Sequence, residues 1–463
     1  MNLLAQLIGM LCISTMQNDS TNSNALWSVR QLTSIDQHHE LDHNDNFSFD
    51  DQWLAFDARP HPDGIAQNTS IGKVNVATGE TKVIYQTKNA TRFGPGVGAV
   101  SYHPTLPQVI FIHGPEAANE EFPYAGHRRV GAIVDENSGE MAYMDTRNIL
   151  PPYIPGALRG GTHRHQWSAD GNWIGFTYND AIMVDLEKKT GKKQDLRTVG
   201  VAHREGPKVV VPEGRGQIQG HWFSALLVQV HADPQPGSGE IGKAYGDWWV
   251  GEKGYPTPSG GQQRARAFMG DLVNSKGETF TEVFMVDVPD RLDQEGEFGP
   301  LAGTDTSMPA PSKGALVHRL THTEERHYPG IATEVRHWLT SSPCGTWISY
   351  LAKDENGIIQ VFLVSTKTKD SFQATHHGSH VQGTVRWHPS GEAFAYLQDN
   401  SIFLADFSSN GKAENHRRII PRSHEAPFSL CWSRSGDILA FNRYVSTSKG
   451  RWMHIFLASP EVE

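Results

Sequence analysis

The chain has 23 histidines among its 463 residues, and several of them recur at positions where they could bind a metal ion together. His163 and His165 stand just before an aromatic residue and a Ser-x-Asp-Gly turn, and His43 and His337 hold the place of His163 before two similar turns. Neutral imidazoles that meet in space can bind a transition metal or Mn²⁺ and leave positions open for water or substrate. We therefore expect a divalent metal, Mn²⁺ first and Ca²⁺ or Zn²⁺ as alternatives, at His43, His163, His165 and His337. The alternative is that each histidine only satisfies a loop carbonyl.

Other polar and aromatic residues are expected beside the histidines. Arg336 and Arg164 are the candidates to clamp an anionic group of a substrate. His221 is the candidate general base, since a histidine is neutral and competent near pH 7. Aromatic faces suit stacking on sugar rings, and segment 231–264 contains several, although its tryptophans could equally anchor the segment to the fold. The expected substrate-binding residues are Tyr245, Trp248, Trp249 and Gln382.

A repeat of roughly 45 residues must position these side chains. Its mark is an aromatic residue, a Ser-x-Asp-Gly or similar turn and an apolar strand, as in 46–56, 162–176 and 427–441. Asp-Gly and Ser-Gly supply the positive φ that tight hairpins need, and the alternating apolar residues that follow predict a strand. Four short strands per repeat predict an all-β fold, a β-propeller, rather than an open β-sandwich. Seven blades are expected to start near residues 43, 97, 162, 218, 335, 382 and 427.

The two ends of the repeat region predict a closed ring. Trp27–Thr33 resembles the last strand of a repeat but precedes the first turn, so we expect it to complete the final blade and leave no open sheet edge. Segment 216–320 lacks a clean turn and is interpreted as an expanded fourth blade with a loop insertion at 231–275. A single propeller domain is expected over 26–463, after a disordered or leader segment at 1–25.

Composition excludes several classes of function. A net charge of −10 and a pI near 6.1 argue against a nucleic-acid partner, because phosphate binding needs a basic face. No G-x-x-x-x-G-K-[S/T] loop and no G-x-S-x-G elbow occurs, and no stretch is long enough for a membrane span. The apolar run within 1–16 has no Lys or Arg before it, which favours a cytoplasmic protein over a periplasmic one with a signal at 1–16. A small molecule or oligosaccharide is the expected ligand, with a protein partner as the alternative.

Several motifs resemble one bacterial family over nearly the whole chain. From about Trp27 onward the sequence is similar to the family typified by the YidR protein, which carries no established activity. The motifs that carry this resemblance include Phe111–Glu116, Arg326–Gly330 and Trp387–Glu392. The resemblance implies kinship more than function.

Two wider resemblances carry functional content. The Ser-x-Asp-Gly repeats resemble TolB-type propellers, which bind proteins. Thr162–His165 resembles the Thr-His-Pro-His segment of oligogalacturonate lyases, seven-bladed propellers that hold Mn²⁺ with histidines and a glutamine. This second resemblance implies that His163 and His165 are metal ligands. The chain departs from the lyase pattern at Gly160, where the lyases have the glutamine, and at Arg164, where they have proline.

Two functions follow as alternatives. The first is a metal-dependent, oligouronide lyase-like enzyme, in which a metal or arginine neutralises the uronate carboxylate and a base removes the C5 proton before β-elimination. The second is a non-catalytic TolB-like propeller that binds a protein or glycan.

Overall fold

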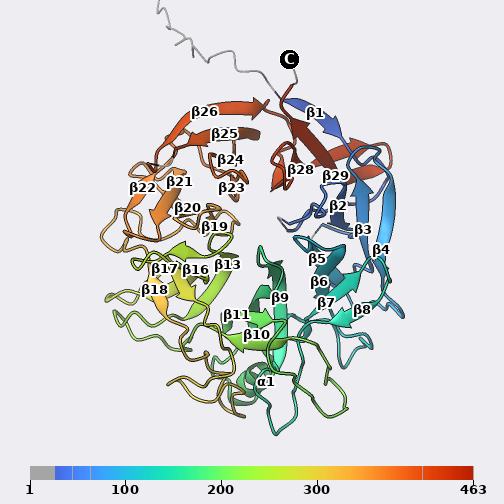
Figure 1. Cartoon of the computed structure of the whole chain (residues 1–463), viewed down its shortest axis with the longest axis vertical. Coiled ribbons are helices and arrows are strands. Elements are labelled where there is room, and N and C mark those ends of the chain that lie inside the picture. Colours follow the sequence, from blue (N-terminus) through green and yellow to red (C-terminus); the bar gives the residue numbers. More distant parts are fainter. Residues whose placement is uncertain (1–26, 44, 63, 409, 462–463) are drawn as a thin grey trace, which may run out of the picture.

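The computed structural model describes residues 27–43, 45–62, 64–408 and 410–461, and these form seven sheets around a central axis (Figure 1). The expected seven-bladed β-propeller is confirmed. Six sheets have four strands, and the first has three. In that first blade the innermost segment is irregular and is joined to its neighbour by bridges from Glu40 to Asp57 and from Phe47 to Leu54. The expected leader segment lies outside the described residues.

Within each blade the strands are antiparallel and follow one another outward from the axis (Figure 1). In chain order they are β2 (Trp53–Asp57), β3 (Ser70–Asn75) and β4 (Thr81–Gln86) in blade 1; β5 (Val97–Tyr102), β6 (Gln108–His113), β7 (Val130–Asp135) and β8 (Met141–Tyr143) in blade 2; β9 (Gly160–Trp167), β10 (Trp173–Asp180), β11 (Arg197–His203) and β12 (Phe223–Leu226) in blade 3; β13 (Lys243–Trp249), β16 (Ala265–Val273), β17 (Thr279–Asp287) and β18 (Val317–Arg319) in blade 4; β19 (Thr340–Ser341), β20 (Trp347–Lys353), β21 (Ile359–Ser365) and β22 (Ser371–Gln373) in blade 5; β23 (Arg386–Trp387), β24 (Ala393–Gln398), β25 (Ser401–Phe407) and β26 (Ala413–Ile420) in blade 6; and β27 (Phe428–Trp432), β28 (Leu439–Thr447), β29 (Gly450–Ser459) and β1 (Ser28–Gln31) in blade 7.

The ring is closed by the N-terminal strand, as the sequence predicts. β1 pairs antiparallel with β29, and the register runs from Ser28 opposite Ser459 to Gln31 opposite Phe456. Closure of this kind joins segments from both ends of the chain in one sheet, so the seventh blade has a paired outer strand next to β29.

The turn motif has one hydrogen-bonding pattern. In blade 3 the Ser168 hydroxyl donates to the Asp170 carboxylate (2.5 Å) and accepts from the Trp173 backbone N–H (3.0 Å). In blade 1 the Ser48 hydroxyl makes the same two bonds, to Asp50 at 2.6 Å and from the Trp53 N–H at 3.0 Å. The serine thereby satisfies a backbone group at the start of the next strand, which explains why the motif marks these hairpins.

The fourth blade differs from the expectation. Phe223–Leu226 does not open it but pairs with β11 as the outer strand β12 of blade 3. The range 231–275, expected to be a loop insertion, contains the two inner strands of blade 4, β13 and β16. A register shift between Tyr245 and Trp248 interrupts β13, so its sequence lacks regular alternation. The longest irregular segment of this blade lies instead between β17 and β18.

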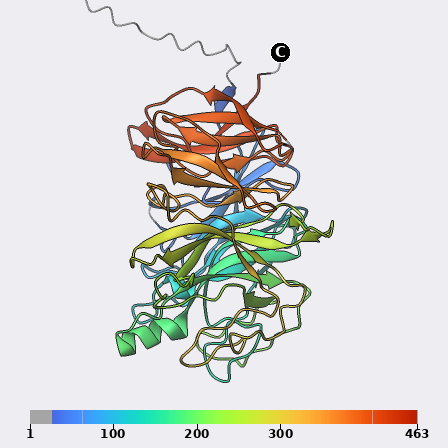
Figure 2. The same ribbon diagram turned by 90° about the vertical axis from the view of Figure 1, so that its left-hand side faces the viewer.

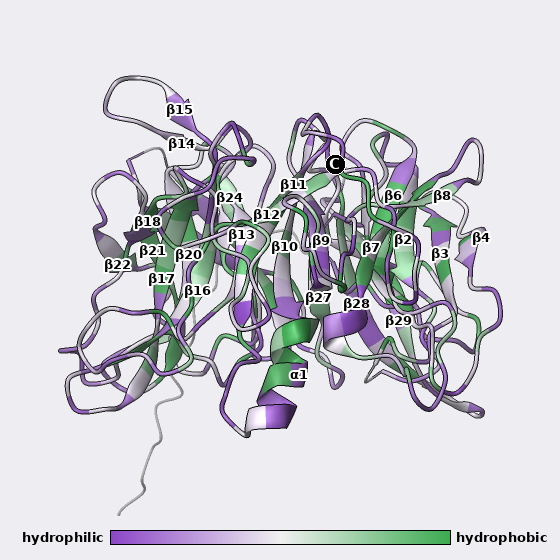
Figure 3. Ribbon diagram, turned by 90° about the horizontal axis from the view of Figure 1, so that it is seen from below, coloured by the Kyte–Doolittle hydropathy of each residue, from purple (hydrophilic) through white to green (hydrophobic). Residues whose placement is uncertain are grey.

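Apolar side chains fill the space between neighbouring blades. Between blades 4 and 5, for example, Ala267 and Val283 pack in one cluster with Ile348 and Val364. Figure 3 shows this apolar character along the middle strands of the ring, such as β3 and β7. Non-directional packing of this kind buries the apolar face of every sheet and holds the ring together.

The two faces of the ring carry different elements. Helix α1 (Ala181–Thr190) starts where the Asp180 carboxylate accepts from the N–H groups of Ile182 and Met183. It projects from one face, and the hairpin β14 (Tyr255–Pro256) and β15 (Gln262–Gln263) projects from the other (Figures 2 and 3). We call these the funnel face and the turn face. A short 3₁₀ helix, η1 (Gly126–Arg128), contacts α1 and β9. Within the described part of the chain, no helix has both the length and the apolar character that crossing a membrane requires.

Candidate functional site

Two adjoining cavities open at the axis on the funnel face. The larger has a volume of about 800 Å³ and the smaller about 360 Å³. We call the two together the funnel. Five residues line both cavities: Asp42, Pro62, Arg164, Arg336 and Trp338. The larger cavity extends over blades 1 to 5 and the smaller towards blades 6 and 7, so the funnel gathers side chains that are far apart in the sequence.

The funnel lies where the inner strands bulge. One residue of the inner strand takes a positive φ in four blades: Ala99 (55°), Arg164 (51°), Gly246 (64°) and Ser429 (52°). The pairing register of each of these strands shifts at this point, and all four residues line the funnel. A bulge redirects side chains, and a positive φ at a non-glycine residue costs about 1–3 kcal/mol, which the rest of the fold must offset. Arg164 is held in the funnel by such a backbone.

Arginines dominate the lining of the funnel. Arg59, Arg129, Arg164, Arg197, Arg336 and Arg386 all line one or both of its cavities. Arg59 and Arg336 make ion pairs with carboxylates. Among the described residues, the other four make no ion pair with a carboxylate. Their bonds go to neutral groups instead: Arg129 donates to the His163 ring (3.0 Å), Arg197 to the Asn179 side-chain oxygen (3.0 Å) and Arg386 to the Leu430 carbonyl (2.7 Å).

Arginine and tryptophan side chains stack along the axis. The Arg164 guanidinium lies 3.7 Å from the Trp338 ring centre and 5.8 Å from that of Trp248. Arg336 lies 4.7 Å from Trp338, and Arg386 lies 5.4 Å from Trp248. At these distances the faces of the aromatic rings attract the guanidinium groups without neutralising their charge.

Burial works against the charge of these arginines. Burial, and then repulsion from Arg386, lowers the pKa of Arg164 to about 9. Burial lowers the pKa of Arg386 to about 10. The Nε–H of Arg164 is buried and has no hydrogen-bond partner among the described residues. A cation in this setting is stabilised by any anion that enters the cavity.

His163 and His337 line the larger cavity, but their ring nitrogens are already used. Arg129 donates to Nδ1 of His163, which therefore carries its proton on Nε2 and donates it to Asn179 (3.1 Å). Burial, and then the charge of Arg129, holds the pKa of His163 well below its usual range. Nδ1 of His337 donates to the Val335 carbonyl (2.8 Å), and its Nε2 accepts from the Leu351 N–H (3.4 Å). Burial lowers the pKa of His337 to about 4.

His43 and His165 take different positions. His43 lines the smaller cavity, where its Nδ1 accepts from the Asp45 N–H (3.2 Å). The neutral ring then carries its proton on Nε2, which is buried and has no partner among the described residues. His165 is fully buried away from the funnel, and its Nε2 bonds the Thr162 hydroxyl (2.8 Å). Burial lowers the pKa of His165 to about 3.

The expected metal site is therefore not assembled. Within the described residues no group of three or more His, Cys, Asp or Glu side chains is placed to hold a metal ion. Arg129 donates to one ring nitrogen of His163, so that lone pair is not free to bind a metal. The positive charge of Arg129 would also repel a metal cation at this position. The alignment of His43, His163 and His337 places all three in the wall of the funnel, but at separate points of it, so these residues do not fit a divalent metal.

The other expected residues divide into two groups. Arg164, Arg336, Tyr245 and Gln382 line the funnel. Trp248 and Trp249 lie outside the expected loop and the funnel lining: they belong to the inner strand β13 and line a cavity on the turn face, and the indole N–H of Trp249 donates to the Gln166 carbonyl (3.0 Å). His221 is exposed and lines none of the axial cavities, so the expected general base lies outside the funnel.

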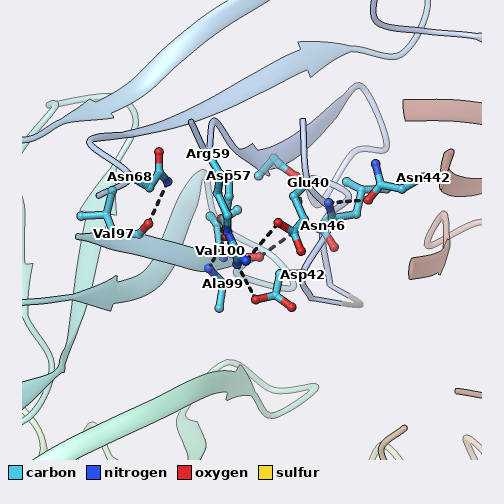
Figure 4. Close-up of polar contacts among 12 residues, drawn as sticks. Glu40, Asp42, Asn46, Asp57, Arg59, Asn68, Val97, Ala99, Val100 and Asn442 are labelled. Carbon is cyan, nitrogen blue, oxygen red and sulfur yellow. Dashed lines mark hydrogen bonds and ion pairs between the residues drawn. The ribbon is translucent and has the colours of Figure 1, made fainter. Parts of the chain in front are cut away.

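Sequence reasoning missed a cluster of carboxylates in blade 1, which Figure 4 shows converging on Arg59. Its guanidinium lies 3.0 Å from Glu40, 2.5 Å from Asp42 and 2.7 Å from Asp57. Asp57 also accepts from the backbone N–H of Ala99 (2.7 Å), which ties blade 1 to the bulge of blade 2. Charged residues at the ends of short strands, such as Asp57 at the end of β2 and Arg386 at the start of β23, were the available signal.

A third cavity of about 300 Å³ lies at the axis on the turn face. Its lining contains five tryptophans: Trp167, Trp248, Trp249, Trp387 and Trp432. Four of the five are buried, so they act mainly as packing between the ends of the inner strands.

Comparisons with known proteins place the chain among propellers. A family described as a protein of unknown function (DUF3748) matches residues 96–216. The uncharacterized protein YidR of Escherichia coli (strain K12) is 37% identical over 423 residues, which cover 89% of this chain and 96% of YidR. Among solved structures, an oligogalacturonate lyase in complex with manganese matches with a TM-score of 0.53 and 11% identity, over 95% of this chain and 94% of the lyase. A putative TolB from Agrobacterium tumefaciens matches with a TM-score of 0.38 and 13% identity, over 85% of this chain and 99% of that one. At 11% identity the lyase match shows the fold alone.

Proposed function

Because the chain belongs to the YidR family and has the propeller fold of an oligogalacturonate lyase, we propose that it binds an acidic carbohydrate of the oligouronide type in the funnel. The observation that carries this proposal is the set of four funnel arginines without a carboxylate partner among the described residues: Arg129, Arg164, Arg197 and Arg386. A carboxylate ligand supplies the charge that these guanidinium groups lack, and a planar guanidinium matches it with two parallel hydrogen bonds.

The shape and surface of the funnel support an oligosaccharide rather than a single small anion. Its two cavities, of about 800 Å³ and about 360 Å³, adjoin at Arg164 and Trp338. The arginines lie in both cavities, so a ligand with more than one carboxylate can satisfy more of them than a monomer can. Trp338 and Tyr245 offer aromatic surface to the apolar faces of sugar rings.

Lyase-type cleavage is the reaction that such a lining would favour. Neutralising the carboxylate of a uronate acidifies its C5 proton, and donors fixed in a cavity stabilise the charge that develops as this proton leaves. Water in the funnel takes the C5 proton, the C5–H electron pair forms the C4–C5 double bond, and the C4–oxygen bond breaks as the departing oxygen takes a proton from water. In this chain Arg129, Arg164 and Arg197 are the proposed carboxylate-binding groups. This takes the place of the metal-dependent mechanism, since the histidines do not fit a metal.

A second candidate is a non-catalytic propeller that binds the same acidic ligand or a protein. It is favoured by the state of the funnel histidines. His163 and His337 use both ring nitrogens within the protein, and in His43 Nδ1 accepts a backbone N–H while the buried Nε2 carries the proton. No described histidine of the funnel is thus placed to take the C5 proton.

Turnover separates the two candidates. The protein is incubated with oligogalacturonates and other oligouronides, and the ultraviolet absorbance of the unsaturated product is followed. Arg129→Gln is the test variant, and Arg291→Gln, an exposed arginine paired with Asp293, is the control. Product formation by the wild type and the control but not by Arg129→Gln supports the lyase. Binding without product supports the non-catalytic propeller, and no binding of any acidic oligosaccharide overturns both forms of the proposal.

A further inference from the structure

The carboxylate cluster of blade 1 holds more negative charge than its cations balance. Glu40, Asp42 and Asp57 all contact Arg59 (Figure 4). The only other cation in ion-pair contact with the cluster among the described residues is Arg336, which lies 3.4 Å from Asp42 and has a side chain 73% exposed to solvent. Three carboxylates that contact one guanidinium also repel one another. The cluster therefore retains a proton at a pH where isolated carboxylates have lost theirs.

Glu40 is the member least compensated by its surroundings. Asp57 accepts from Arg59 and from the backbone N–H groups of Ala99 and Val100. Asp42 faces two arginines, and although burial alone would raise its pKa, Arg59 and Arg336 bring the pKa of Asp42 below its usual value. Glu40 lies 3.0 Å from Arg59, but its Oε2 makes no well-aligned hydrogen bond within the described residues. Burial, and then the charge of Asp42, raises the pKa of Glu40 to about 8.

The charged and titratable groups around Glu40 come from several blades. Asp42 and His43 lie on its own segment, Asp57 and Arg59 on β2 and the turn after it, and Arg336 on the segment before β19. The smaller cavity, which Glu40 lines, adds Arg164 from β9, Arg386 from β23 and Tyr444 from β28. The lining of this cavity therefore combines the cations of Arg164, Arg336 and Arg386 with the carboxyl groups of Glu40 and Asp42, and an uncharged Glu40 would face an anion with less repulsion than an ionised one.

The cavity beside Glu40 is also a place where hydrogen-bond donors lack acceptors. His43 and Arg164 both line this cavity, and the buried Nε2–H of His43 and Nε–H of Arg164 behind its surface have no partner within the described part of the chain. We propose that Glu40 stands in the funnel as a neutral carboxylic acid and donates its O–H to an oxygen of the bound anion, alongside these two donors. This rests on the proposed function, and it makes Glu40 a residue that determines ligand specificity.

The protonation of Glu40 is tested without a ligand. The infrared spectrum of the wild type at neutral pH is compared with that of Glu40→Gln, whose amide keeps the shape of the neutral acid. The expected difference is a carboxylic-acid C=O band that the wild type has and the variant lacks, and that fades in the wild type as the pH rises through about 8. The matched control is Glu324→Gln, since Arg319 keeps the Glu324 carboxylate ionised. An ionised Glu40 at neutral pH, with no such band, overturns the inference.

Its role towards the ligand is tested by calorimetry with trigalacturonic acid between pH 6 and pH 9.5. The wild type is expected to lose affinity above about pH 8, by up to tenfold for each pH unit. Glu40→Gln should lack this loss and show only the weaker decline near pH 9 that both proteins share through Arg164, whose pKa is about 9. Equal pH dependence in the two proteins contradicts the donor role. If the wild type binds no trigalacturonate at any pH, the proposed function and the donor role fail together, and the infrared band still decides whether Glu40 is neutral. If Glu40→Gln does not fold, the pH dependence of the carboxylic-acid band in the wild type alone still tests whether Glu40 is neutral.

Discussion

The two mouths of the central channel are built by opposite ends of the same inner strands, yet they differ in how far the blades repeat. On the turn face, blades 1, 3, 5 and 7 each place a serine hydroxyl at the same point, where it accepts a backbone N–H five residues on. These serines are Ser48, Ser168, Ser342 and Ser433. In blades 2 and 6 a histidine ring, of His103 and His388, accepts the N–H two residues on instead.

On the funnel face the bulge of the inner strand recurs in four blades, but the side chains around it differ from blade to blade. One blade presents the carboxylates of Glu40 and Asp42, another the pair His163 and Arg164, and a third Arg386. Side chains that recur on the turn face thus satisfy the backbone of the fold, whereas the side chains that differ between blades on the funnel face line the cavity. This is the division between the two faces.

The largest effect is expected from Glu40, because a buried group that shifts its pKa changes stability with pH. Its pKa of about 8 in the folded protein lies above the 4.5 of an unperturbed glutamate. The folded state therefore holds the extra proton between these values, and raising the pH through this window destabilises the wild type by about 1.4 kcal/mol per pH unit. Glu40→Gln should lack this loss. Urea denaturation of both proteins between pH 5 and 9 checks it, and parallel curves would contradict it.

Arg164 tests the funnel face next. Arg164→Gln removes a buried cation without a carboxylate partner among the described residues, so it should weaken trigalacturonate binding by about 100-fold while leaving the melting temperature unchanged or higher. Calorimetry and thermal unfolding measure the two effects, with Arg291→Gln as the exposed control. A fall in melting temperature with unchanged binding would make Arg164 a residue of the fold.

Ser168 tests the turn face. Ser168→Ala removes the acceptor of the Trp173 N–H and the donor to Asp170, which should destabilise the protein by about 1 kcal/mol and leave ligand binding within about twofold of the wild type. Urea denaturation and calorimetry are the measurements, and Ser259→Ala in the exposed hairpin is the control. Weaker binding at unchanged stability would break the division between the faces.

The smallest effect is expected from chelation. The funnel histidines do not fit a metal ion, so dialysis against EDTA should change trigalacturonate binding by less than twofold. Elemental mass spectrometry before and after dialysis serves as the control for metal removal. A loss of binding that Mn²⁺ restores would reinstate the metal site expected from the histidine alignment.

The sequence predicts the parts of the molecule that repeat. Ser-x-Asp-Gly turns such as 168–171 are recognisable because their hydrogen bonds join residues close together in the sequence. The closing strand is recognisable because its pattern matches the end of other repeats. β13 was missed because the bulge at Gly246 and the charge of Asp247 hide its alternation. The contact between Arg129 and His163 could not be predicted from the sequence either, since Arg129 lies on another blade and only the folded chain brings the two together.

The central claim is that arginines of the funnel hold a carboxylate ligand. The most direct measurement is calorimetric titration of the wild type with trigalacturonic acid and with its fully methyl-esterified form, repeated with an Arg164→Gln/Arg386→Gln variant. The account predicts that the wild type binds the acid at least about 100-fold more tightly than the ester, and that this preference disappears in the variant. Equal affinity for acid and ester, or an undiminished preference in the variant, would contradict it.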